Sequence, residues 1–187
     1  MSTAGGRVTS GVEMGKGEKN RGATMVEAAL IFPLMILLTV SILELGLAFK
    51  DFLTISFTAR DASRVGSLAG NDPEADCDII QSVVAAFGAS DLAGVDILIF
   101  KANEATGDPV VGQVNTWTLN SGDANDCGDW TVLETWPSTT RQVNVGPTTK
   151  LDILGVTIET THQWITGLPP WRGSINVSRT ALQRIEP

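Results

Sequence analysis

The stretch RGATMVEAALIFPLMILLTVSIL, residues 21–43, decides the architecture of this chain of 187 residues. From Ala28 to Leu43 it contains no charged side chain, and beyond one acidic residue, Glu44, its apolar character continues to Phe49. A helix of about 20 apolar residues can span the hydrocarbon core of a bilayer. The sequence therefore predicts a transmembrane helix over residues 23–49. Pro33 lies inside this helix and is expected to kink it, because proline removes one backbone hydrogen bond.

The two flanks of the predicted span differ in charge. Residues 1–22 carry four basic and two acidic side chains and few large apolar ones, which predicts a disordered basic leader. After the span, Lys50 is followed directly by Asp51. The positive-inside rule then predicts a cytoplasmic leader and an extracytoplasmic remainder, with Glu44 as an interfacial residue at the outer end. A secretory signal peptide fits less well, because the apolar run is long and no A-x-A site ends it.

A glycine, a glutamate five residues later and an apolar helix follow one another at the start of the span. This order resembles the type IV pilin class of signal. The surrounding residues resemble the TadE-like pseudopilins of tight-adherence (Tad) pilus systems; they are Arg21-Gly22-Ala23, Val26-Glu27-Ala28-Ala29-Leu30 and Pro33. The resemblance implies that a membrane prepilin peptidase cuts the bond Gly22–Ala23, which makes Glu27 the fifth residue of the mature chain. Glycine suits such a bond because it presents an extended backbone without a side-chain clash.

Glu27 has two interpretations that the sequence leaves open. An ionisable residue near the start of a bilayer helix costs roughly 2–3 kcal/mol and needs a partner. The resemblance implies that this partner is the N-terminal amine of a neighbouring subunit, a pairing that sets the axial register during assembly. The alternative is a first-turn residue at the headgroup level, where the helix dipole favours a negative charge.

The resemblance also implies a function and a set of partners. The chain would be a minor pseudopilin in Tad (Flp) pilus biogenesis, acting in pilus assembly and adhesion. It would be a single-pass protein of the cytoplasmic (inner) membrane, in contact with membrane lipid. The implied protein partners are the prepilin peptidase, the assembly ATPase, membrane platform proteins, the major Flp-type pilin and other pseudopilins. Two alternatives are a permanently anchored binding module or adhesin that uses the Trp-rich region after residue 116, and an anchored enzyme.

The rest of the chain predicts a helical stalk followed by a small domain. Apolar and small residues recur in steps of three and four over residues 50–70, and Asn71-Asp72-Pro73 ends this pattern. Residues 71–187 are expected to form the extracytoplasmic domain. It should hold a helix from Pro73 to Gly88 and then strands at 95–101, 110–119, 130–136 and from 151 onward. The predicted fold class is α+β: a long N-terminal transmembrane and stalk helix, then a domain with an antiparallel β-sheet.

Cys77 and Cys127 are the chain's two cysteines, and an extracytoplasmic location makes a disulfide the default pairing. The alternatives are two buried free thiols or a redox pair, although their spacing is not that of a C-x-x-C redox motif. Four residues have the spacing of an EF-hand loop: Asp123, Asn125, Gly128 and Glu134. Cys127 occupies its fifth position, where an oxygen ligand belongs, and the flanks do not resemble helices. We therefore expect a turn-rich loop and no metal site.

Composition and motifs exclude several other functions. The net charge of −8, from 13 basic and 21 acidic residues, argues against a nucleic-acid partner. The single histidine, His162, has no accompanying nucleophile motif, so no catalytic role is expected for it. The chain also lacks the glycine patterns of phosphate-binding and dinucleotide-binding loops, and no cofactor is predicted.

Overall fold

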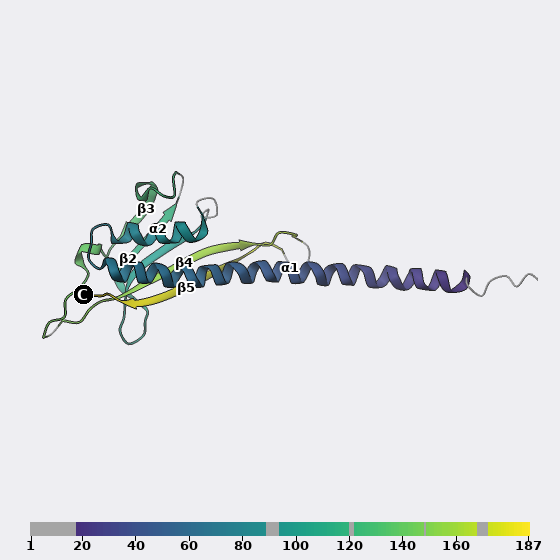
Figure 1. The fold of residues 1–187 in the computed structure, drawn as a ribbon, viewed down its shortest axis with the longest axis horizontal. Helices are drawn as coiled ribbons and strands as arrows, with labels where there is room; N and C mark the ends of the chain where they lie inside the picture. The colour runs from purple at the N-terminus through teal and green to yellow at the C-terminus, as the bar shows by residue number, and fades with distance from the viewer. Residues whose placement is uncertain (1–17, 89–93, 120–121, 148, 168–171) are drawn as a thin grey trace, which may run out of the picture. The chain divides into compact units, whose positions relative to one another are not determined.

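A computed structural model describes residues 18–88, 94–119, 122–147, 149–167 and 172–187. Most of the predicted leader, residues 1–17, lies outside the described residues. The main elements follow the chain in Figure 1; they are α1 (Glu18–Ala69), α2 (Ala75–Phe87), β1 (Asp96–Ala102), β2 (Pro109–Leu119), β3 (Trp130–Glu134), β4 (Ile153–Gln163) and β5 (Ser174–Arg184). Two short 3-10 helices, η1 (Cys127–Asp129) and η2 (Ser138–Thr140), flank β3. The contacts divide the chain into two units, before and after the bond between Leu43 and Glu44.

Helix α1 contains a segment that is long and apolar enough to cross a membrane. It begins at Glu18, four residues before the predicted end of the leader, because lysine, arginine and glutamate are good helix formers. The bond Gly22–Ala23 therefore lies within helical backbone. Helix α1 continues through Pro33 and ends at Ala69. Gly70 follows it with a φ of +60°, the left-handed conformation that commonly ends helices.

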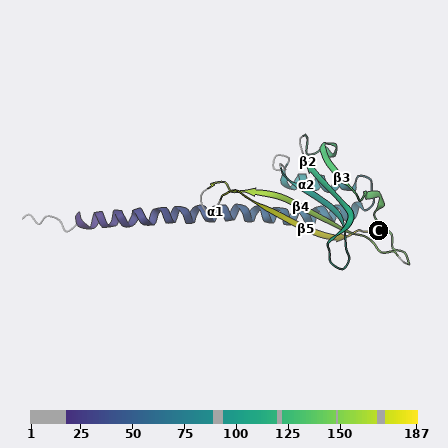
Figure 2. The ribbon, with the colours of Figure 1, turned by 180° about the vertical axis from the view of Figure 1, so that it is seen from behind.

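The second unit confirms the predicted α+β fold. The five strands among its described residues form one antiparallel sheet in the order β3-β2-β1-β4-β5. Ile97 of β1 pairs with Ile158 of β4, and Ile99 pairs with Val156, so these four buried side chains share one face of the sheet. The view from behind in Figure 2 shows the sheet with α2 and the C-terminal half of α1 on its far side.

The core lies between this face of the sheet and the two helices. Helix α1 contributes Ile55, Ala59 and Ala62, which are at most 1% exposed. Helix α2 contributes the buried residues Ile79, Ile80, Val83 and Val84. The stripe of small residues that the sequence places after residue 50 is thus the side of α1 that packs on the domain. Glu44–Ala69 is therefore a helix of the second unit, with one side in the core.

Candidate functional site

The predicted processing and assembly residues lie in the first unit, on α1. Gly22, Ala23 and Glu27 are all exposed, and a Cβ atom added to Gly22 would have no other atom within 4 Å. Ala23 and Glu27 are four residues apart, so they lie on the same face of the helix, one turn from each other. Within the part of the chain that the structure describes, Glu27 has no ion pair. The motif is therefore accessible from outside the chain.

The apolar surface that follows this motif is also exposed. Many large apolar side chains of α1 are more than half exposed, and they are distributed around the helix rather than on one stripe. Examples are Leu30 at 74%, Phe32 at 63% and Leu38 at 54%. A helix that is apolar all round and unburied by protein is typical of a membrane span.

Glu44 is the next acidic residue of α1 after Glu27, and it is 1% exposed. Its carboxylate accepts two backbone hydrogen bonds from the segment after β4. The N–H of Ile165 donates to Oε2 at 3.2 Å, and the N–H of Thr166 donates to Oε1 at 2.6 Å. Two donors to one carboxylate compensate for removing its charge from water. Glu44 thus joins α1 to the turn of the β4–β5 hairpin.

Two further contacts join α1 to the same hairpin. Asp51 Oδ2 lies 2.7 Å from Nδ1 of His162, which is on β4 and whose side chain is 4% exposed. The guanidinium of Arg179, on β5, lies 3.8 Å from the centre of the Phe52 ring, a cation–π contact. Arg179 is the pairing partner of the buried Ile158, so its side chain lies on the face of the sheet that packs on this helix. His162 has a structural role here, since it links the helix to the sheet.

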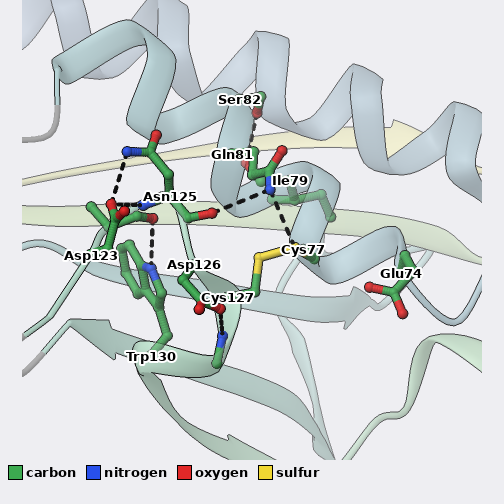
Figure 3. The surroundings of a disulfide bond; sticks show 12 residues. Glu74, Cys77, Ile79, Gln81, Ser82, Asp123, Asn125, Asp126, Cys127 and Trp130 are labelled. Atoms are coloured by element: carbon green, nitrogen blue, oxygen red, sulfur yellow. Dashed lines mark hydrogen bonds between the residues drawn. A yellow bond between two sulfur atoms is a disulfide. The ribbon is translucent and has the colours of Figure 1, made fainter.

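Cys77 of α2 and Cys127 of η1 form a disulfide, with their Cα atoms 5.7 Å apart (Figure 3). Beside it, Gln81 Nε2 donates to the carbonyl oxygen of Asn125 at 3.5 Å. Trp130 Nε1 donates to the carbonyl oxygen of Ala124 at 3.1 Å, and its indole is buried in the core. The disulfide therefore anchors the 122–129 loop to α2.

The carboxylates of that loop bind the loop's own backbone. Asp123 Oδ1 accepts from the backbone and side-chain nitrogens of Asn125, both at 2.9 Å, and these bonds lower the pKa of Asp123. Asp126 Oδ1 accepts from the N–H of Gly128, and Asp129 Oδ2 accepts from the N–H of Asp123. These are the side-chain-to-backbone bonds that stabilise turns. They give the positions of Asp123, Asn125 and Gly128 in that loop a structural explanation.

A buried polar network was not predicted from the sequence. Asp76 of α2 forms an ion pair with Arg141 and accepts a 2.8 Å hydrogen bond from Asn115 of β2. Asn115 is fully buried, and its amide also bonds the backbone of Thr135 and Trp136. The only sequence signal is a polar residue in an apolar strand pattern, which does not reveal partners 39 or 21 residues away.

A search of curated proteins and a search of solved structures gave no match to this chain. A family model does match it, over residues 22–64. That range begins at Gly22, contains Glu27 and Glu44, and ends within α1, so α2 and the β-sheet lie outside it. Over this segment, which carries the exposed motif and the apolar helix, the chain matches the family described as TadE-like protein, the family that its N-terminal sequence resembles.

Proposed function

We infer from the TadE-like match that the chain acts in a Tad pilus system. We propose that the chain is a membrane-anchored minor pseudopilin of such a system, cleaved between Gly22 and Ala23 by a prepilin peptidase and acting in pilus assembly and adhesion. The observation that carries this proposal is the match over residues 22–64, which contain the exposed Gly22 and Glu27 and the apolar part of α1.

The proposed topology follows from the charges around the helix. The leader is cytoplasmic, α1 crosses the inner membrane once, and the domain is extracytoplasmic. The basic residues of the leader and the disulfide between Cys77 and Cys127 support this orientation, because disulfides persist in oxidising compartments. The partners are the peptidase, the assembly ATPase, the platform proteins, the major Flp-type pilin and other pseudopilins.

Cleavage would create the group that Glu27 needs. The cut leaves a free amine at Ala23, one helical turn from Glu27 on the same face. A carboxylate and an amine that enter the bilayer as a pair each lower the free-energy cost of inserting the other. This holds whether the amine belongs to the same chain or to a neighbouring subunit. We propose that the neighbour's amine is the partner in the assembled state, which gives each subunit a fixed axial position.

Mass spectrometry of the membrane-extracted chain tests the processing step. A mature N-terminus at Ala23 is expected in cells that have the peptidase, and Gly22→Leu should leave the leader attached. Gly46→Leu is the matched control, because both glycines are helical and neither would bring an added Cβ within 4 Å of another atom. An intact leader on the unmutated chain, in cells that process their other prepilins, would refute the proposal.

The role of Glu27 is tested separately. Glu27→Ala should insert and be processed normally, but pilus assembly should fall. Asp78→Ala, which removes an exposed carboxylate from α2, is the control and should assemble normally. Normal piliation by Glu27→Ala would remove the pairing with the N-terminal amine from the proposal, while leaving the cleavage step intact.

We further propose that the chain is a substrate of the peptidase and is not itself an enzyme. His162, its one histidine, is engaged with Asp51 at the contact between helix and hairpin. The alternative of a permanently anchored binding module or adhesin that uses the Trp-rich region has less support, because Trp130 and Trp136 are 4% and 3% exposed in the core and Trp117 packs against that core. Trp171 lies outside the described residues.

A further inference from the structure

The turn after β4 contacts α1 at Glu44, where the uncharged run Ala28–Leu43 has just ended. Glu44 is the residue directly after that run, and its carboxylate holds the N–H groups of Ile165 and Thr166. A second contact, between Asp51 Oδ2 of α1 and His162 Nδ1 of β4, fixes the direction of β4 along the helix. From Glu44 to Asp51 the helix rises about 10 Å, and from Ile165 back to His162 the chain extends about 10 Å. The hairpin therefore runs alongside the helix and ends beside Glu44.

The length of the uncharged run fixes where Glu44 lies in a bilayer. From Glu27 to Glu44 the helix rises about 25 Å, which is less than the hydrocarbon thickness of about 30 Å. The helix therefore cannot place both carboxylates outside the hydrocarbon, and with Glu27 at the inner boundary Glu44 lies at or just inside the outer one. Any group that is hydrogen-bonded to Glu44 lies at the outer boundary with it.

We propose that the turn at Trp164–Gly167 dips into the outer headgroup region of the bilayer that α1 crosses, and that Ile165 contacts lipid there. This inference rests on the proposed function only in requiring that α1 span a membrane. The partner is the lipid–water interface, so the domain has a second attachment to the membrane besides its helix.

The side chains around the turn suit that location. Ile165 is 73% exposed, and on the adjoining turns of α1 Leu45 and Phe49 are 51% and 61% exposed. Residues 163–167 carry no charge. Trp164 packs edge-on against His162, with the ring centres 5.0 Å apart, and tryptophan is enriched at membrane interfaces. Moving an exposed isoleucine side chain from water into the lipid lowers the free energy, whereas in a soluble domain this side chain would stay hydrated.

Spin labelling of the full chain in phospholipid vesicles tests the proposal. The native cysteines form a disulfide, so an introduced cysteine is the only free thiol among the described residues. Ile165→Cys places the label on the turn, and Glu159→Cys, also exposed on β4, is the matched control about 20 Å away along the strand. A label at Leu38→Cys reports whether the apolar part of α1 lies in the lipid. Oxygen, which partitions into lipid, and a water-soluble nickel chelate are the two relaxing agents.

We expect the ratio of oxygen to nickel collisions to be several-fold higher at Ile165 than at Glu159, and to approach the ratio at Leu38. Equal ratios at Ile165 and Glu159, with Leu38 in lipid, would overturn the inference and leave the proposed function standing. A label at Ile165 that neither agent reaches would also overturn it, because this result indicates contact with a second protein copy. Nickel access at Leu38 would overturn the span and the inference together.

Discussion

At the scale of single residues, the packing of α1 on the domain depends on Gly66. A Cβ atom there would lie 2.4 Å from Leu154 Cδ2 and 2.5 Å from Ile79 Cδ1, and both of these side chains are fully buried. Gly66→Ala should lower the free energy of unfolding by about 1–3 kcal/mol through overpacking. Denaturant unfolding of the detergent-solubilised chain, followed by tryptophan fluorescence, measures this change.

Gly46→Ala is the matched control for Gly66→Ala, because Gly46 lies on the same helix and a Cβ atom added there would have no other atom within 4 Å. Alanine favours helix over glycine by up to about 1 kcal/mol. The control should therefore unfold at the same denaturant concentration or a higher one. Equal destabilisation of the two variants would show that the close contact at Gly66 is not the cause.

The ion pairs of Glu104 predict that the stability of the folded chain depends on pH. It lies between β1 and β2 and bonds Lys150 Nζ at 2.7 Å and Arg184 Nη2 at 3.2 Å, and these two cations, Lys150 above all, lower its pKa. Because the folded pKa lies below the unfolded one, this stabilisation is present above the usual glutamate pKa of about 4.3. It is lost as the pH falls through the folded pKa.

Glu104→Gln should therefore unfold more readily than the unmutated chain near neutral pH, and the difference should shrink as the pH is lowered from about 6 to about 3. The effect should be small and sensitive to salt, because the three side chains are exposed. Glu134→Gln, on the edge strand β3, is the control and should show no such convergence. A difference between Glu104→Gln and the unmutated chain that stays constant over this pH range would contradict the assignment.

At the scale of elements, the disulfide between Cys77 and Cys127 fixes α2 against the loop before β3. It closes a loop of 50 residues, for which the chain-entropy model gives about 4 kcal/mol. Reduction of the unmutated chain should therefore lower its unfolding midpoint. The Cys77→Ala/Cys127→Ala double variant should show the lower midpoint with or without reductant. If the unfolding midpoint of the unmutated chain did not change with reductant, this prediction would be wrong.

The elements themselves could be predicted from local patterns, whereas their contacts could not. The three- and four-residue spacing of Ile55, Ala59 and Ala62 identifies the buried face of α1, because this periodicity is a local property. The partners of Glu44 and Arg179 could not be inferred, since they lie more than 100 residues away and depend on strand register. A buried carboxylate signals that a partner exists without identifying it.

At the scale of the whole molecule, the candidate site and the fold differ in how they could be predicted. Gly22 and Glu27 were predicted by resemblance to a family, and the matching range ends within α1. The sheet domain lies outside that range, and its fold was predicted from periodicity and turn residues. The helix joins the two parts, because its residues after Leu43 belong to the domain.

Because the residues of α1 after Leu43 belong to the domain, we expect only a fragment that includes them to fold. A chain of residues 44–187, exported to an oxidising compartment, should form the Cys77–Cys127 disulfide and unfold cooperatively, because it retains Ile55, Ala59 and Ala62. A chain of residues 71–187 should fail to do so, since it leaves the sheet face opposite these residues exposed. Trypsin resistance and thermal unfolding compare the two fragments. Cooperative unfolding of residues 71–187 would show that α1 is only an anchor and that the domain core is complete without it.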